Sequence, residues 1–373
     1  MTETVDRTIE VWEYLPEYEA ERDELLATVD RVFRSGRLVL GESLAGVERE
    51  FAAYCGVAHG VGVDNGTNAI VLGLRALGVQ AEDEVITTSN AAPGTVVAIQ
   101  QLGARAVFVD IDPATYLMDV GKLKSAITRD TTCIVPAHLF GQCVDMDRVQ
   151  RIAGDRGIPI LEDCAHAPGA TFRNRRAGSM GHAAAFSFHP TKVLGAYGDG
   201  GMVVTDDGET ARRLRCLRHF GMEGGYTVVD PGYDSRLDEV QAEILRRKLT
   251  RLESYIDGRR AIAARYREGL ADVPALVLPK ETGWGRHVYH VYAVRHPERD
   301  RIVALLKDLG INVGIPRPRP LHMMSGFNHL GYGPGDLPET EAAARECLSL
   351  PMFPSLTRDR QDRVLDAIRK VAE

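Results

Sequence analysis

Lysine is scarce in this chain of 373 residues. Lys and Arg together number 45, but only seven of them are Lys, so Arg supplies most of the positive charge. The lysines are Lys122, Lys124, Lys192, Lys248, Lys280, Lys307 and Lys370. With 52 acidic residues the formal net charge is -7, which disfavours nucleic acid as the main partner. Chemistry that needs an amine nucleophile therefore has few side chains to use.

The chain also lacks cysteine motifs and long apolar runs. Its six cysteines form no C-x-x-C pair and have no histidines at ligand spacing, which predicts buried thiols and no metal site. Unpaired thiols are typical of a reducing compartment. No run approaches the roughly 18 apolar residues of a membrane-spanning helix, and the acidic N-terminus has no signal-like apolar core. We therefore expect a cytoplasmic protein with no membrane span.

Short apolar segments rich in β-branched residues alternate with helical patterns between residues 55 and 205. This order is typical of β-α-β units and predicts a mainly parallel sheet that is covered by helices on both faces. The expected strands are Gly60–Val63, Glu84–Thr87, Ala106–Asp110, Thr132–Pro136, Ile158–Leu161, Ala183–Phe188 and Met202–Thr205. The expected helices between them include Thr67–Leu77 and Met146–Asp155.

A long helical pattern follows at Leu237–Leu270, with apolar residues recurring every three or four positions. We expect it to bridge two domains. Beyond it, residues 287–294 (HVYHVYAV) predict a strand, and Arg299–Leu309 and Arg358–Ala372 predict helices. A Pro-rich loop covers Ile315–Leu321.

Asp163 and Lys192 are the most informative pair of residues. Each is expected just past the carboxyl end of a strand, and that edge of an open α/β sheet is where ligands bind. A carboxylate and an amine that face one crevice suit pyridoxal phosphate (PLP), because the lysine can form the Schiff base while the carboxylate keeps the pyridine nitrogen protonated. The spacing alone also allows an ordinary salt bridge or a solvated lysine.

A series of motifs extends over nearly the whole chain. In order they read SGRLVLGESLAGVEREFAAYCGV, VDNGTNAI, EVITTS, GARAVFVDID, AHLFGQCVDM, ILEDCAHAPGA, FSFHPTKVLGAYGDGG, SRLDEVQAEIL and CLSLPMFPSLT. With these motifs the chain resembles the DegT/DnrJ/EryC1/StrS family of PLP-dependent sugar aminotransferases. The E-D-x-A and S-F-x-P-x-K segments together are the most specific part of the resemblance.

The resemblance implies a role for each residue of these motifs. Lys192 would form the Schiff base and move the proton between substrate and cofactor, and Asp163 would pair with the pyridine nitrogen. The hydroxyl of Ser187 would bind the cofactor phosphate. Gly66 and Thr67, which open a helix, would bind the same phosphate through their N–H groups and the Thr hydroxyl. The alternative for VDNGTNAI is a plain strand-turn-helix with a Thr cap.

Three residues depart from the family pattern around the cofactor. His166 stands where the family usually has Gln beside the phenolic oxygen, and an imidazole can still donate a hydrogen bond there. Asn90 falls where many members carry an aromatic residue that stacks on the ring. Either that stack is lost or another side chain supplies it, and Asn90 is a candidate contact of cofactor or substrate. Asp234 stands where the family often has an Asn that reaches the phosphate in the neighbouring subunit, and a carboxylate there would repel the phosphate.

A fourth departure lies in the segment IPRPRPLH, where the family often reads H-Y-P-x-P-x-H. Pro316 and Arg317 replace the histidine and the tyrosine, whereas His322 matches. Guanidinium groups on a Pro-stiffened loop can grip a diphosphate or a carboxylate with two hydrogen bonds. We interpret Arg317 and His322 as substrate-binding residues, with Arg317 on the anionic part of the substrate. The alternative is a solvated surface loop.

Two further histidines have no assigned role. His138 follows a strand, where a hydrogen-bonded polar group is favoured over a cofactor contact. His290 lies on the strand expected at residues 287–294 and could face either the core or the site.

The resemblance implies an aspartate-aminotransferase-like (type I) fold. We expect a large PLP-binding α/β domain with an N-terminal arm at residues 1–250, built on a mainly parallel seven-stranded sheet. A small α+β domain is expected at residues 251–373. A homodimer with active sites at the subunit interface is also implied.

The implied reaction transfers an amino group from L-glutamate to a keto group of a nucleotide-linked deoxysugar, often dTDP-linked. The product would be an aminosugar for an antibiotic or a surface glycan. Two alternatives stay open: a keto-cyclitol or aminoshikimate-type amino acceptor, and a PLP-binding sensor without catalysis. Some relatives have become dehydratases by replacing the lysine or by adding iron–sulfur cysteines. The presence of Lys192 and the lack of a cysteine cluster disfavour that activity.

Overall fold

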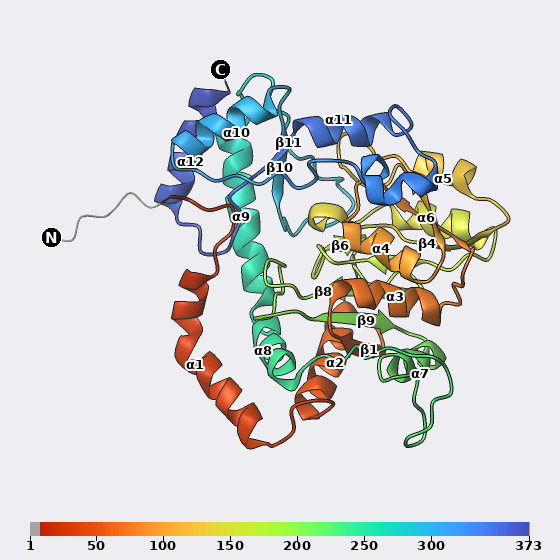
Figure 1. Ribbon diagram of the computed structural model, residues 1–373. Helices are drawn as coiled ribbons and strands as arrows, with labels where there is room; N and C mark the ends of the chain where they lie inside the picture. The colour runs from red at the N-terminus through yellow and green to blue at the C-terminus, as the bar shows by residue number, and fades with distance from the viewer. Residues whose placement is uncertain (1–7, 373) are drawn as a thin grey trace.

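The computed structural model describes residues 8–372 (Figure 1). Residues 1–7 of the predicted N-terminal arm, and residue 373, lie outside the described residues. The chain continues as α1 (Leu15–Arg34), which packs along α8 (Glu239–Leu249). From residue 8 to residue 372, no helix combines the length and the apolar character that crossing a membrane requires.

Seven strands form the central sheet. They are β1 (His59–Val63), β2 (Glu84–Thr88), β3 (Arg105–Val109), β4 (Thr131–Ile134), β5 (Leu161–Asp163), β8 (Ala183–Ser187) and β9 (Gly201–Thr205). Their spatial order is β1-β9-β8-β5-β4-β2-β3, because bridges between residues 134 and 160 and between residues 137 and 163 join a four-stranded segment to a three-stranded one. Neighbouring strands are parallel except at β9, which runs antiparallel to both β1 and β8. The predicted seven-stranded, mainly parallel sheet is confirmed.

Helices cover both faces of this sheet. Their bounds are α2 (Glu42–Cys55), α3 (Gly66–Ala76), α4 (Pro93–Gln101), α5 (Val120–Ala126), α6 (Met146–Gly154) and α7 (Gly208–Leu217), and smaller elements are η1 (Leu139–Gly141), β6 (Thr171–Phe172) and β7 (Arg175–Arg176). Successive residues of a strand point to opposite faces. In β2, Val85 belongs to the apolar core cluster that includes residues of α3, α4 and α7, whereas Ile86 belongs to the cluster that includes residues of α2, α5 and α6. Both faces are therefore closed, and the strand ends remain for ligand binding.

One strand begins later than the sequence predicts. The apolar run at Ile158–Leu161 is expected to pair, but β5 covers residues 161–163. Pro159 in this run has no N–H to donate to a neighbouring strand. Asp163 does donate its N–H, to the Pro136 carbonyl at 3.0 Å. Asp163 is thus the last residue of a strand rather than a residue just beyond it.

The helical pattern predicted at Leu237–Leu270 is helical in the structure, which divides it into α8 and α9 (Leu252–Leu270). At the break the Thr250 hydroxyl donates to the Arg247 carbonyl at 2.7 Å. In a continuing helix that carbonyl would accept from the N–H of Arg251. The Arg251 N–H bonds to the Lys248 carbonyl instead, at 3.0 Å. In Figure 1, α9 runs from the end of α8 toward the C-terminal elements.

The C-terminal part packs around α9 and a two-stranded antiparallel sheet. Its other elements are β10 (Tyr292–Arg295), α10 (Arg299–Asp308), η2 (Leu321–Met323), η3 (Ser325–Leu330), α11 (Pro338–Glu346), β11 (Cys347–Leu350) and α12 (Arg358–Val371). Ile9 joins the apolar core of this part, whereas Leu321 and Phe327 pack in the core of the large sheet. A domain boundary at residue 250 would fall at the break between α8 and α9, and it stays a proposal.

Candidate active site

The carboxyl ends of β5 and β8 lie next to each other. Asp163 ends β5 and pairs in register with Ala185 of β8. Ser187 ends β8. Lys192 follows in the next loop, where its N–H donates to the His189 carbonyl at 2.8 Å. The parallel pairing therefore brings an acid, a hydroxyl and an amine to one edge of the sheet.

The Asp163 carboxylate is buried and held in one orientation. Only 5% of the residue is exposed. Its Oδ2 accepts a hydrogen bond from the Thr95 hydroxyl at 2.8 Å, and its Oδ1 accepts from the Ala165 N–H at 3.1 Å. Thr95 lies in the first turn of α4 and is fully buried. A fixed, buried negative charge of this kind is suited to face a protonated ring nitrogen.

The N-terminus of α3 lies against Ser187. A Cβ added at Gly66 would be 2.5 Å from the Cβ of Ser187, so this close approach requires glycine. Gly94 in α4 is similarly close to Thr67, because a Cβ there would be 2.6 Å from the Thr67 hydroxyl. The four predicted phosphate donors, two hydroxyls and two backbone N–H groups, are thus gathered where glycine leaves room for them.

The first turn of α3 has N–H groups available for a ligand. Asn65 is the N-cap residue, and its side chain accepts from the Asn68 N–H at 2.9 Å. The alternative expectation of a Thr cap is therefore wrong. The N–H groups of Gly66 and Thr67 have no acceptor within the helix. Because a helix N-terminus also carries a partial positive charge, these residues fit the phosphate of PLP.

A cavity of about 330 Å³ is lined by Lys192, His166, His290 and Arg317, among others. His166 accepts a hydrogen bond at Nδ1 from the Phe140 N–H at 3.2 Å, which leaves its proton on Nε2. Burial and the charge of Lys192 hold the pKa of His166 well below its usual value. His166 is therefore a neutral imidazole that can donate from Nε2, the state that its predicted role requires.

His290 lies in the same cavity, although the sequence left its position open. Its ring centroid is 4.3 Å from that of His166, and its Nδ1 is buried without a hydrogen-bond partner among the described residues. Residues 287–291 form no strand, so the alternation expected there gives no guide to its direction.

Sequence reasoning also misses Thr95, because its contact with Asp163 joins two different β-α units.

The Lys192 amine is prepared for nucleophilic chemistry. Its pKa is lowered from 10.5 to about 8, first because burial removes water from the ammonium group and second because the Arg317 guanidinium repels it. The Asp163 carboxylate acts in the opposite direction. At neutral pH a larger fraction of this amine is uncharged than of a lysine in water.

We expect the apoprotein to attach the cofactor aldehyde at a rate that rises with pH to a midpoint near pH 8. Only the neutral amine attacks, and its fraction grows until the pH exceeds the pKa of about 8. A lysine with the ordinary pKa of 10.5 would give a rate that still rises roughly tenfold per unit between pH 8 and pH 10. Stopped-flow absorbance measures the rate. A midpoint at or above pH 10 would contradict the lowered pKa.

Arg317 reaches the cavity from the Pro-rich loop. Its Nε donates to the carbonyls of Asn90 (3.2 Å) and Ala91 (3.0 Å), and its Nη1 donates to the Pro316 carbonyl (2.7 Å). Asn90 is buried, and its Nδ2 has no partner among residues 8–372. The loop is packed at Arg317 and exposed at Arg319, so the alternative of a fully solvated loop is wrong. Arg317 therefore joins the residues around Lys192.

His322 and Asp234 do not line this cavity. The Nδ1 of His322 lies 2.8 Å from the Ser89 hydroxyl, and its Nε2 lies 3.3 Å from a carboxylate oxygen of Glu341. His322 thereby fixes the Pro-rich loop to the loop after β2. Asp234 is exposed and pairs with Arg236 at 2.8 Å. The ligand-binding roles of both residues stay predictions.

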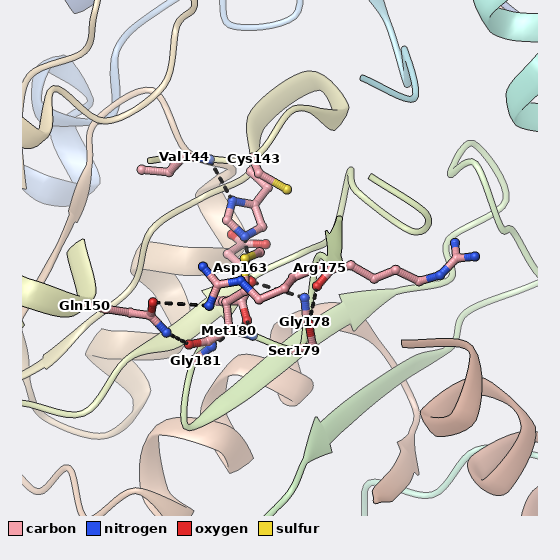
Figure 2. Close-up of polar contacts among 12 residues, drawn as sticks. Cys143, Val144, Gln150, Asp163, Arg175, Gly178, Ser179, Met180 and Gly181 are labelled. Atoms are coloured by element: carbon pink, nitrogen blue, oxygen red, sulfur yellow. Dashed lines mark hydrogen bonds and ion pairs between the residues drawn. The ribbon is translucent and has the colours of Figure 1, made fainter. Parts of the chain in front are cut away.

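A buried polar cluster supports the strand that carries Asp163 (Figure 2). The carboxylate of Glu162 accepts from the backbone N–H groups of Gly178, Met180 and Gly181, at 3.1, 2.7 and 2.6 Å. His138 Nε2 lies 2.8 Å from the same carboxylate, and its Nδ1 accepts from the Val144 N–H at 3.2 Å. Ligand atoms of His138, Glu162 and Cys164, one from each residue, lie within 4.8 Å of one another, a spacing that a metal ion can use. Their hydrogen bonds are complete without an ion, and burial raises the pKa of the Cys164 thiol.

A second cavity, of about 370 Å³, shares Trp12 and Lys192 with the first. Aromatic residues such as Tyr197 line much of it. Its other lysine, Lys248, is paired with Glu17 at 3.0 Å. The two cavities together give space around Lys192 for a substrate larger than an amino acid.

Known proteins share this combination of a mainly parallel sheet, a lysine in the loop after β8 and a predicted phosphate site at the N-terminus of α3. The model of the DegT/DnrJ/EryC1/StrS aminotransferase family matches residues 19–369. The chain belongs to this family. The resemblance predicted from the motifs is confirmed.

Individual members of the DegT/DnrJ/EryC1/StrS family are similar to this chain over most or all of their length. A dTDP-3-amino-3,4,6-trideoxy-alpha-D-glucose transaminase of Micromonospora megalomicea subsp. nigra is 56% identical over 369 residues, which are 98% of this chain and 99% of that protein. The crystal structure of S. venezuelae DesV in complex with a ketimine intermediate gives a TM-score of 0.96 at 41% identity, covering 98% of this chain and 99% of that chain. NtdA from Bacillus subtilis with bound cofactor PMP gives 0.90 at 29% identity, covering 98% and 86%. These likenesses confirm the predicted aminotransferase fold.

Proposed function

We propose that this family member is a PLP-dependent aminotransferase that moves an amino group from L-glutamate to a keto group of a dTDP-linked keto-deoxysugar. The observation that carries the proposal is the 56% identity, over 98% of the chain, to a transaminase of dTDP-linked sugars. The position of Lys192 and Asp163 at one edge of the sheet supports the proposal, because PLP chemistry needs an amine for the Schiff base and a carboxylate for the ring nitrogen.

The residues at the sheet edge fit the cofactor part by part. PLP, when bound, supplies an electron-accepting ring that stabilises charge at the reacting carbon. The hydroxyl of Ser187 and the first turn of α3, at Gly66 and Thr67, would hold its phosphate. Asp163 would face the ring nitrogen, and His166 would donate from Nε2 to the phenolic oxygen.

Lys192 would act twice in each half of the reaction. As a neutral amine it is the nucleophile that attaches the cofactor, and once released it moves a proton between the substrate carbon and the cofactor. A lysine with an ordinary pKa has a far smaller neutral fraction at neutral pH, so both steps would be slower. The lowered pKa of Lys192, about 8, therefore serves both steps.

A cytoplasmic homodimer with shared active sites is part of the proposal. Leu15, Leu26 and Phe33 are exposed on α1 at spacings that place them along one side of the helix. An apolar stripe of this kind is a surface that a second subunit can cover. The predicted contact of Asp234 with a cofactor phosphate depends on that second subunit.

A panel of dTDP-linked 3-keto and 4-keto deoxysugars and a keto-cyclitol, each incubated with holoenzyme and L-glutamate, tests the proposal. We expect amination of the 3-keto sugar, because the relative at 56% identity is named for a 3-amino sugar. Product mass and NMR identify the aminated carbon. Amination of a keto-cyclitol instead would favour that alternative. PLP that stays bound without converting glutamate would favour a sensor.

A further inference from the structure

Arg317 forms no ion pair within residues 8–372, although the charge of the Asp163 carboxylate attracts it from a distance. Its hydrogen bonds go to three backbone carbonyls. Its Nη2 is buried and has no partner there. A guanidinium that loses water and gains no hydrogen-bonded ion pair is costly to keep in a folded protein. The arrangement is that of a binding group whose partner is a ligand.

The position of Arg317 narrows the choice of ligand. It lines the same cavity as Lys192, and its charge is close enough to lower the pKa of that lysine. Nε is fixed by the carbonyls of Asn90 and Ala91, which leaves Nη2 and one N–H of Nη1 as a rigid pair of donors. This geometry matches the two oxygens of a carboxylate.

Three anionic groups enter the proposed reaction: the α-carboxylate and the γ-carboxylate of L-glutamate, and the diphosphate of the sugar. In an α-amino acid the carboxylate is bonded directly to the carbon that bears the reacting nitrogen. In a 3-keto sugar the diphosphate is separated from the reacting carbon by further ring carbons and the glycosidic oxygen. A cation beside the catalytic amine therefore matches the α-carboxylate.

We propose that Arg317 binds the α-carboxylate of the amino donor, and that His290 offers a neutral hydrogen-bonding group in the same cavity. The inference rests on the proposed aminotransferase function and adds which of the two substrates the Pro-rich loop recognises. The unpartnered Nδ1 of His290 and its place beside His166 support its part. A neutral imidazole keeps the charges matched, with one guanidinium for one carboxylate.

The test uses holoenzyme and three amino donors: L-glutamate, its α-amide and its γ-amide (L-glutamine). Loss of the cofactor absorbance band in single turnover measures each donor reaction without any sugar. We expect the wild type to prefer L-glutamate over the α-amide by roughly 10- to 100-fold in the second-order rate constant. Arg317→Gln should lose most of this preference, because its rate should fall further with L-glutamate than with the α-amide. The α-amide rate measures the separate effect of losing the positive charge beside Lys192.

Controls separate this role from others. Arg319→Gln, in the exposed part of the same loop, should keep the wild-type preference. Arg317→Lys keeps the positive charge and should retain part of the preference for L-glutamate. This second variant also keeps the test valid if Arg317→Gln folds poorly. The sugar direction, measured with the aminosugar product and the PLP form of the holoenzyme, should fall in Arg317→Gln no further than the α-amide reaction does, because both lose only the Arg317 charge beside Lys192.

Three results would overturn the inference: equal wild-type rates with L-glutamate and its α-amide, a preference that depends on the γ-carboxylate instead, or an Arg317→Gln defect confined to the sugar direction. Failure of the proposed function looks different. If the enzyme uses another amino acceptor, the donor reaction proceeds and only the reaction with the aminosugar is absent. A sensor would convert no donor at all.

Discussion

Replacement of Lys192 by Ala is expected to abolish amino transfer, with kcat reduced by at least about 10³-fold. The variant loses both the covalent attachment of the cofactor and the base that moves the proton. No other lysine can take its place, because among the residues around the two cavities only Lys248 carries an amine, and that amine is paired with Glu17 at 3.0 Å. Formation of 2-oxoglutarate measures the rate, and mass spectrometry after borohydride reduction measures attachment.

The matched control is Lys307→Ala. Lys307 is exposed on α10, so its removal should leave both measurements unchanged. Circular dichroism should show that both variants are folded, since the Lys192 side chain makes no hydrogen bond or ion pair with residues 8–372 that the substitution would remove. Retention of a reducible cofactor bond in Lys192→Ala, with loss of that bond in another lysine variant, would refute the assignment of Lys192.

The sequence alone could predict the pair of Asp163 and Lys192 because local patterns position both. Apolar runs place one residue at the end of a strand and the other in the loop after the adjacent strand, and parallel pairing brings those ends together. The pattern is less reliable for exact strand limits. Pro159 delays β5, so Asp163 lies within the strand and not beyond it.

Contacts between distant segments could not be read from the sequence. Arg317 bonds to the carbonyls of Asn90 and Ala91, more than two hundred residues earlier in the chain. No periodicity records such a contact, because it depends on how the Pro-rich loop docks on the loop after β2. His322 shows the opposite case. It matches a family motif, yet both of its ring nitrogens are engaged by Ser89 and Glu341.

The break between α8 and α9 could not be predicted from the sequence for a different reason. Both helices keep an apolar face, so the periodicity continues across the break. The contacts at the break are local but polar, because both the hydroxyl and the N–H of Thr250 donate to the Arg247 carbonyl. Hydrophobic patterning carries no information about competition for one carbonyl group.

Asp163→Asn should lower kcat by about 10²- to 10³-fold while leaving the cofactor covalently attached. The substitution removes the negative charge that would keep the ring nitrogen protonated, but it does not touch Lys192. Steady-state kcat and the cofactor absorbance spectrum separate the two effects, since attachment depends on the lysine and electron withdrawal depends on the acid. Equal losses of attachment and of kcat would contradict this division of roles.

The fold should tolerate this change, because the two donors at Asp163 differ in kind. The Ala165 N–H can only donate, so an Asn would turn its carbonyl oxygen toward it. Its amide N–H would then face the Thr95 hydroxyl, which can reverse its role from donor to acceptor. Thr95→Val provides the matched control, because it keeps the charge of Asp163 and removes one orienting bond. We therefore expect Thr95→Val to cost less than about tenfold in kcat, and a loss as large as that of Asp163→Asn would mean that orientation, not charge, is the main contribution of the acid.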